Sequence, residues 1–203
     1  MAPSAGAPAP DVCAKTSPAP KAADLRFILR DATDVAHRRL DAGFAAYDLT
    51  RRADYLAFLM AMQAAFAPLE AWLDETDPGF LPMDWPQRRR AEALRVDLQG
   101  LGIVASEGSS AVPPPTLPAD AAPGVLYVLE GSRLGGQVLL RQVLASPDPV
   151  VRENARFLRH GEGLRFWPSF SAWLCTRPVL EHEPAISGAL CAFALFERTQ
   201  ANR

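Results

Sequence analysis

Residues 127–140 read YVLEGSRLGGQVLL, an apolar helical pattern that Gly131, Gly135 and Gly136 interrupt. Glycine inside a helix costs about 1 kcal/mol relative to alanine, so three of them cost about 3 kcal/mol if their effects add. A helix that contains all three therefore needs a compensating reason at these positions.

Three explanations for these glycines make different predictions. A tight crossing lets another backbone approach the helix, and physics alone favours this interpretation. A kink would instead bring the helix backbone against a flat ligand. A phosphate-binding loop does not fit, because the spacing is not G-x-G-x-x-G and no strand precedes the segment.

Helical periodicity extends to both sides of this stretch. Apolar residues recur at steps of three and four from about residue 22, and again in a longer stripe that begins after Arg51 and ends before the turn residues 77–79. The two predicted faces consist of Leu25, Ile28, Leu29, Ala32, Ala36 and Leu40, then Tyr55, Phe58, Leu59, Met62, Phe66, Leu69 and Leu73.

The remainder of the body also has helical patterns. We expect one helix from Asp84-Trp85-Pro86 to Gly100 or Gly102, a loop at 105–118, and helices at about 119–145, 149–160, 168–177 and 183–200. No sustained alternation of period two and no internal repeat is found. The sequence therefore predicts an all-α domain over residues 22–203.

Residues 1–21 differ from this body, since they are rich in Ala and Pro and have almost nothing large to bury. We expect a disordered tail, in which Cys13 is an exposed thiol. The stretch lacks the basic start and apolar run of a signal peptide, which favours the cytoplasm. Cys175 and Cys191 are expected to be buried and reduced, because the three cysteines form no paired motif.

Composition excludes several classes of protein. The 203-residue chain is 49% hydrophobic with a net charge of −2, which argues against disorder and against a broad attraction to nucleic acid. Charges or prolines break its apolar runs before the roughly 20 residues that a membrane span needs. Only three histidines are present, so a multi-histidine metal cluster is not expected.

His37 lies beside the apolar face of the first predicted helix. Arg30 precedes it by about two turns and Thr33 by about one, so the three share nearly one face. A single histidine there is more often half-buried and bonded to a backbone carbonyl than an iron ligand.

Together, two segments change this interpretation. The pattern L-R-D-A-T-x-x-x-H-x-x-L at 29–40 resembles the proximal helix of heme oxygenases, and Y-V-L-E-G-S-x-L-G-G at 127–136 resembles the distal helix of their bacterial branch, which includes enzymes associated with bacteriophytochromes. Residues 192–197 resemble the last helix of the family. The resemblance covers about 24–200 and implies a multi-helix bundle with a glycine-kinked distal helix.

The resemblance implies a site and a chemistry. His37 would be the proximal ligand of a b-type heme, which is both cofactor and substrate, and Gly131, Gly135 and Gly136 would let the distal backbone approach bound O2. The expected products are biliverdin, carbon monoxide and ferrous iron. The expected partners are heme and an external electron donor, either a reductase or a ferredoxin. By resemblance alone, a bacteriophytochrome is expected to receive the product. The protein is expected to be a monomer.

Cations are expected at the rim for the heme propionates. Arg30 stands where the family commonly has a basic residue, and a later segment offers Arg152, Arg156 and Arg159, each with a solvated helix face as its ordinary alternative. With Thr33, the residues Arg30, Arg156 and Arg159 are the predicted heme-binding set.

The sequence departs from the mammalian relatives after the first glycine. Those relatives have an aspartate there, whereas this chain has Ser132, as in the bacterial branch; a serine can hold water but supplies no carboxylate. Arg133 faces either the pocket or solvent. His160 either borders the pocket or is a surface or capping histidine, and we expect it and His182 to lie outside the site.

Other functions remain alternatives. A di-iron oxidase needs a second pair like Asp34-x-x-His37, which is absent from the sequence, and a thiamin-degrading relative needs a nucleophilic cysteine in a polar setting. A helical interaction module that uses the tail lacks a clear docking motif. A heme or bilin carrier without turnover would need the same residues as the enzyme, so it stays the main alternative.

Overall fold

The computed structural model describes residues 24–103, 113–177 and 182–201, and these are helical or irregular without a strand. The α-helices are α1 (Leu25–Phe44), α2 (Arg52–Asp74), α3 (Trp85–Arg88), α4 (Ala91–Gly100), α5 (Ala122–Leu144), α6 (Pro149–Glu153), α7 (Arg156–Arg159), α8 (Phe166–Cys175) and α9 (His182–Ala201). Two short 3-10 helices, η1 (Pro78–Phe80) and η2 (Ala119–Ala121), complete them. The all-α prediction is confirmed.

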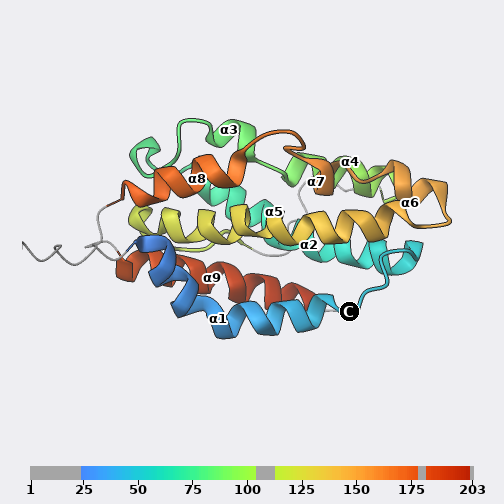
Figure 1. Ribbon diagram of the computed structural model, residues 1–203, viewed down its shortest axis with the longest axis horizontal. Helices are drawn as coiled ribbons and strands as arrows, with labels where there is room; N and C mark the ends of the chain where they lie inside the picture. Colours follow the sequence, from blue (N-terminus) through green and yellow to red (C-terminus); the bar gives the residue numbers. More distant parts are fainter. Residues whose placement is uncertain (1–23, 104–112, 178–181, 202–203) are drawn as a thin grey trace, which may run out of the picture.

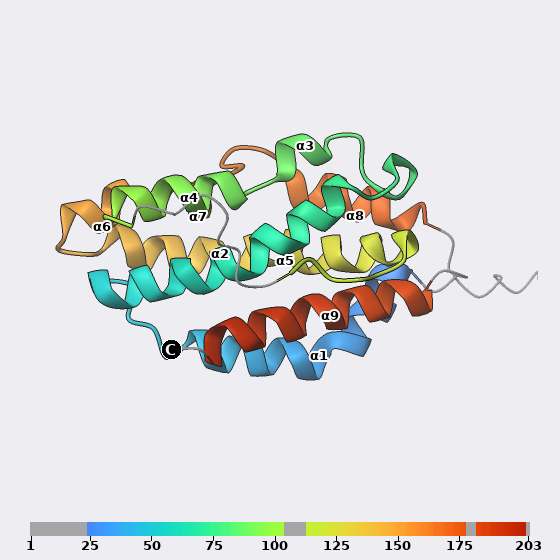
Figure 2. The same ribbon diagram turned by 180° about the vertical axis from the view of Figure 1, so that it is seen from behind.

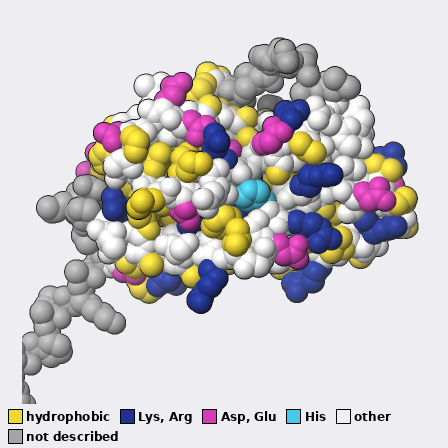
Figure 3. Space-filling view, turned by 90° about the horizontal axis from the view of Figure 1, so that it is seen from above, with side chains coloured by type: hydrophobic (Ala, Val, Ile, Leu, Met, Phe, Trp, Pro, Cys, Tyr) yellow, Lys and Arg dark blue, Asp and Glu magenta, His cyan; other side chains and the backbone are white. Residues whose placement is uncertain are grey.

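The helices lie in three tiers (Figures 1 and 2). Helices α1 and α9 run side by side in one tier, α2 and α5 occupy the middle, and α3, α4, α7 and α8 cover the opposite side. The main packing is of α1 and α5 on α9, and α2 contacts both α4 and α9. Basic and acidic side chains are interspersed on the face that Figure 3 shows, in keeping with the small net charge.

The core is built around α2. The predicted stripe is buried, with Tyr55, Leu59, Phe66, Leu69 and Leu73 fully enclosed. By length and composition alone, α2 is the one described helix that could cross a membrane, but 56% of its most apolar window is buried inside the protein. A core helix meets the same criterion, so this is weak evidence for a span.

Two glycines allow α5 and α9 to cross closely. A Cβ atom added to Gly124 of α5 would lie 1.7 Å from the carbonyl oxygen of Ala185, and one added to Gly188 of α9 would lie 2.3 Å from that of Ala121. Both distances are far inside van der Waals contact and involve backbone, which cannot move aside as a side chain can. These glycines are therefore required by packing.

The predicted single helix at 84–102 is wrong, since it divides at Arg89 and Arg90 into α3 and α4. The buried carboxylate of Glu70, on α2, accepts hydrogen bonds from the backbone N–H groups of Arg90 (2.7 Å) and Ala91 (2.9 Å). These groups begin α4 and would otherwise lack partners. The Glu70 carboxylate therefore caps the N-terminus of α4 and allows a new helix to begin there.

The predicted helix at 149–160 also divides, at Asn154 and Ala155, into α6 and α7. Asp97 of α4 is fully buried and accepts from the backbone N–H groups of Arg156 (3.0 Å) and Phe157 (2.8 Å). The Tyr55 hydroxyl donates to the carbonyl of Asn154 at 2.7 Å. Carboxylates on α2 and α4 therefore begin α4 and α7 respectively.

The predictions for the tail, the loop, the cysteines and the glycine kink have different outcomes. The tail at 1–21, with Cys13, and part of the loop at 105–118 lie outside the described residues, while 113–118 contain no helix. The prediction of buried cysteines is wrong, because Cys175 is exposed at the end of α8 and Cys191 is half-buried. Helix α5 is unbroken through its glycines, so the kink remains a prediction.

Candidate functional site

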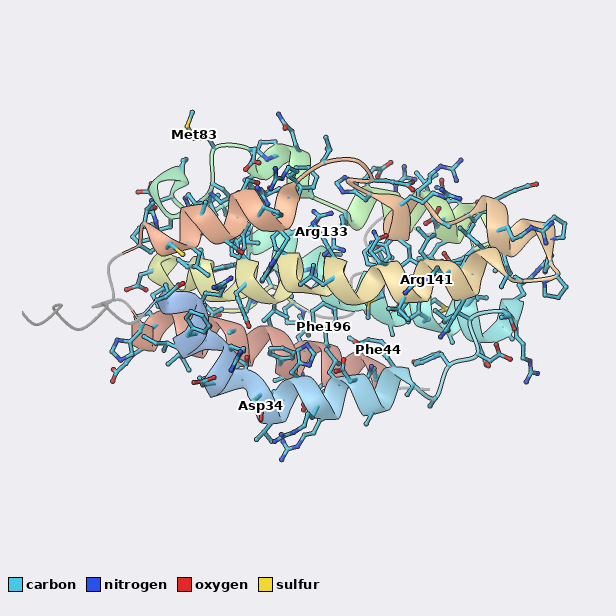
Figure 4. The ribbon with its side chains drawn as sticks, viewed as in Figure 1. Asp34, Phe44, Met83, Arg133, Arg141 and Phe196 are labelled. Atoms are coloured by element: carbon cyan, nitrogen blue, oxygen red, sulfur yellow. The ribbon has the colours of Figure 1, made fainter. Side chains whose placement is uncertain are left out.

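A cavity of about 870 Å³ lies between α1 and α5 and is closed by side chains from α2, α7, α8 and α9. In Figure 4, Phe44 and Phe196 point into the space between the tier of α1 and α9 and the helix α5. Seven of the predicted site residues line this cavity: Arg30, Thr33, His37, Gly131, Ser132, Gly135 and Gly136. The volume is within the range typical of small-molecule and cofactor sites.

The three glycines of α5 that line the cavity are not explained by packing. A Cβ added to Gly135 would meet nothing within 4 Å. Added to Gly131 or Gly136, it would only make ordinary contacts, at 3.7 Å with Trp167 and 3.8 Å with Leu158. The tight crossing favoured from the sequence is therefore wrong for these three positions, and the open space beside them belongs to the cavity.

His37 borders the cavity from α1. Its Nδ1 atom lies 3.0 Å from a carboxylate oxygen of Asp41, one turn later, and its ring meets that of Phe193 edge-on with centroids 5.9 Å apart. The side chain is 62% exposed. An imidazole that uses Nδ1 for a carboxylate has Nε2 left for another ligand.

Arg30, Thr33 and Tyr127 also line the cavity. Arg30 is 70% exposed and, within the described part of the chain, forms one ion pair, with Asp31 at 3.4 Å. Thr33 is buried and donates to the carbonyl of Leu29 at 2.7 Å. Burial raises the pKa of Tyr127, while the nearby charges of Arg30 and Arg26 act in the opposite direction. A flexible cation and a phenol thus lie close together.

Arg90 was not foreseen as a site residue, because it was assigned to the interior of a continuous helix. Its side chain is buried on the rings of Phe66 and Phe157. It donates to the carbonyl of Leu129 and, at 2.7 Å, to Ser132 Oγ, and it lines the cavity. Burial lowers its pKa to about 9, which leaves it charged near pH 7.

A second group of buried charges surrounds Glu130, the residue before the first of these glycines. Its carboxylate is 1% exposed and accepts from Arg88 Nη1 at 2.7 Å and from Arg133 at 3.0–3.1 Å. Arg88 also pairs with Asp84 and donates to Ser169, so α3, α5 and α8 meet here. A glutamate inside the apolar run of 127–140 was the sequence signal for this network.

His160 lines the cavity, as one of its two alternatives from the sequence predicted. It is also the C-cap residue of α7, and Arg133 binds both its Nδ1 atom and its carbonyl oxygen at 3.1 Å. Burial and the charge of Arg133 lower the pKa of His160 to about 4. The question left open for Arg133 is answered too, because it lines the cavity with 10% of its side chain exposed.

Comparison with known proteins identifies the family. Heme oxygenase PigA of Pseudomonas aeruginosa is 33% identical over 180 residues, which are 83% of this chain and 89% of that protein. The chain belongs to the heme oxygenase family. A heme oxygenase of Xanthomonas campestris pv. campestris is 38% identical over 114 residues, 55% of this chain and 67% of that one. No protein-family model matches the chain.

Solved heme oxygenases share the fold. The NO- and CO-bound heme oxygenase from Neisseria meningitidis superposes with a TM-score of 0.73 at 21% identity, over 89% of this chain and 92% of that one. The heme oxygenase from Leptospira interrogans gives 0.64 at 17% identity, over 89% and 100%. The chain thus has the heme oxygenase fold, and the curated relatives make it an enzyme of the heme oxygenase family.

Two predicted residues of this heme oxygenase lie away from the cavity. Arg156 is half-exposed and lies 3.5 Å from the carboxylate of Asp97, and Arg159 lies 3.3 Å from that of Glu162. Neither lines the cavity. Helix α7 is only four residues long, so the one-turn spacing of these arginines does not point them at the site. Among the described residues, no group of three or more His, Cys, Asp or Glu side chains is placed to hold a metal ion.

Proposed function

We propose that the cavity binds a b-type heme between α1 and α5, and that the enzyme opens this heme with O2 and externally supplied electrons to biliverdin, carbon monoxide and ferrous iron. The observation that carries the proposal is the set of helical glycines, Gly131, Gly135 and Gly136, whose missing side chains face the cavity and relieve no contact within the protein. Their cost of about 3 kcal/mol makes sense if a bound ligand needs that space.

The residues present fit a heme. The cavity is bounded largely by apolar and aromatic side chains, among them Phe44, Phe58, Phe193 and Phe196, as a flat macrocycle requires. One histidine reaches it from α1, and a heme needs only one protein ligand on its proximal side. The bound macrocycle supplies the iron at which O2 is activated and the ring that is cleaved.

His37 is the proximal ligand in this proposal. Asp41 accepts a hydrogen bond from Nδ1–H, which fixes the tautomer and orients Nε2. The exposed position of His37 suits a residue that a ligand covers on binding, and Phe193 limits the rotation of its ring.

Arg30 and Tyr127 bind the propionate end of the heme, beside Thr33, whose hydroxyl proton is already donated to the Leu29 carbonyl. Arg30 has no buried partner to lose, so its planar guanidinium is able to turn toward a carboxylate. Tyr127 adds a hydroxyl donor at the same end. Arg156 and Arg159 have no part in this assignment.

On the distal side, Ser132 and the glycines face the other heme surface. Ser132 Oγ accepts from Arg90 and donates to the carbonyl of Leu129, both at 2.7 Å, so the hydroxyl is held in a fixed direction. Ser132 has no carboxylate, and the buried charge of Arg90 orders water there instead.

The electrons come from a reductase or a ferredoxin. The bacteriophytochrome-associated branch, and with it a bacteriophytochrome that receives biliverdin, is supported by the resemblance of residues 127–136 alone. A monomer that works in the cytoplasm is the form we expect.

Hemin turnover tests the proposal. Purified protein is titrated with hemin, then given ascorbate in air while the spectrum is recorded. We expect loss of the Soret band and growth of the long-wavelength biliverdin band. A heme spectrum that persists under reductant without a bilin product would overturn the proposal.

A His37→Ala variant tests the proximal assignment in the same experiment. The variant should lose the spectrum of histidine-ligated heme, and His182→Ala, at the start of α9 and outside the cavity lining, is its matched control. An unchanged ligated spectrum in His37→Ala would refute the assignment.

A further inference from the structure

The charged network beside the distal wall determines the protonation of His160. We propose that Arg133, held by Glu130, is a positioning residue that keeps His160 a neutral imidazole with its single proton on Nε2, where it is a hydrogen-bond donor into the cavity. Only the identity of what receives that hydrogen bond rests on the proposed function; the tautomer follows from the protein alone.

Arg133 is fixed on every side. Its guanidinium donates to the Glu130 carboxylate at 3.1 Å and to the carbonyl of Arg88 at 2.6 Å, and it lies over the ring of Phe166 at 4.8 Å. Its remaining nitrogen, Nη1, lies 3.1 Å from both Nδ1 and the carbonyl oxygen of His160. Figure 4 shows Arg133 extending from α5 toward the tier that contains α8, away from Phe44 and Phe196.

This geometry decides the tautomer. A guanidinium has donors and no acceptor, so the His160 Nδ1 atom can only accept. The neutral imidazole then has its one proton on Nε2. The doubly protonated form would direct an N–H of its own at Arg133 and lose the hydrogen bond.

The charges around His160 also favour the neutral form. The positive charges of Arg133 and Arg90 disfavour protonation of His160, whereas the negative charge of Glu130 favours it. The negative charge of Glu130 is already engaged by Arg88 and Arg133. Together with burial, this holds the pKa of His160 at about 4.

The Nε2 side of the ring has no hydrogen-bond partner among the residues that the structure describes, although His160 lines the cavity. Its ring lies nearly parallel to that of Phe166, at 14° with centroids 6.1 Å apart, so its plane is set. In the proposed function, this hydrogen bond would go to an oxygen atom of water or of the O2 substrate, which Ser132 does not supply with an acid. The Nε2–H group of His160 can therefore donate a hydrogen bond into the cavity while the imidazole stays uncharged.

Imidazole nitrogen NMR on the heme-free protein tests the proposal directly. The chain has only three histidines, so His37 and His182 serve as internal references for His160. In the wild type we expect the Nε2–H tautomer at His160 and no protonation between pH 8 and pH 5. An Nδ1–H tautomer, or titration near pH 6.5, would contradict the proposal.

Two substitutions separate positioning from folding. Arg133→Met should give a mixture of tautomers and raise the pKa of His160 toward its ordinary value, whereas Arg95→Met, which removes an exposed arginine paired with Glu92, should change neither. Arg133→Gln offers a second route if Arg133→Met does not fold, because its amide can still form hydrogen bonds but the guanidinium charge is removed, and it should raise the pKa of His160 in the same direction. Unchanged His160 spectra in the folded variants would overturn the proposal.

Turnover separates this proposal from the proposed function. With hemin and ascorbate, Arg133→Met should slow biliverdin formation about tenfold while hemin affinity stays within about twofold, since supporting residues typically contribute 10- to 100-fold. Equal turnover in variant and wild type would refute the donor role. If the wild type forms no biliverdin, the proposed function fails, while the tautomer is still decided by the NMR spectra.

Discussion

Helix α5 contains glycine near its start and in its middle, for opposite reasons. Near its start, Gly124 packs against the backbone of α9, where an added Cβ would lie 1.7 Å from the Ala185 carbonyl oxygen. Seven to twelve residues later, Gly131, Gly135 and Gly136 could each accept a Cβ without a clash. The first glycine is explained by packing within the protein, whereas no internal contact explains the other three, which is the basis for the proposed ligand.

The difference shows how a site can be recognised without its ligand. All four glycines lie within α5, where glycine is less favourable than alanine, and the sequence does not distinguish them. Only the surroundings of each glycine do. A glycine that lowers helix stability and relieves no contact within the protein indicates that something outside the protein needs the space. The following substitutions test that distinction.

Gly124→Ala should have the largest effect on stability. The added methyl group would overlap backbone atoms of α9, which forces the two helices apart, and we expect a loss of about 3 kcal/mol. Urea unfolding of the heme-free protein measures it. A variant as stable as the wild type would show that the crossing is looser than described.

Gly135→Leu should have the next largest effect, on heme rather than on folding. The side chain would enter the cavity, so hemin affinity should fall at least about 100-fold, or about 2.7 kcal/mol. Hemin titration and urea unfolding are compared on the same sample. Normal affinity with unchanged ring cleavage would remove Gly135 from the site.

Gly135→Ala should have the smallest effect and the opposite sign to Gly124→Ala. Because nothing lies within 4 Å of the new methyl group, the heme-free protein should gain about 1 kcal/mol from the higher helix propensity of alanine. Urea unfolding again measures the change. Destabilisation would mean that Gly135 has a packing role after all.

Much of the fold follows from local pattern. The apolar stripes predict α1, α2, α5 and α9, and these helices bring His37 and the three cavity glycines to one cavity. The breaks before α4 and α7 could not be predicted in this way. They depend on Glu70 and Asp97, which lie 20 and 59 residues before the N–H groups that they bind.

The site was predicted less completely than the fold. Arg156 and Arg159 have regular helical spacing, which resembles a binding face, yet they pair with carboxylates outside the cavity. Arg90 and Arg133 reach the cavity because buried partners hold them, and a sequence does not show burial of an arginine. The cavity glycines stood out because each is costly inside a helix, whereas His37 was singled out only through the resemblance of residues 29–40.

The carboxylates that begin α4 and α7 have a consequence for cooperativity. Glu70 joins α2 to α4, and Asp97 joins α4 to α7, which carries Phe157 and Leu158 to the cavity wall. If α7 or α4 moved away, the backbone N–H groups at its start would lose the carboxylate that binds them, Asp97 for α7 and Glu70 for α4. The wall should therefore open together with the core as one unit, and its amide hydrogens should exchange at rates close to those of α2.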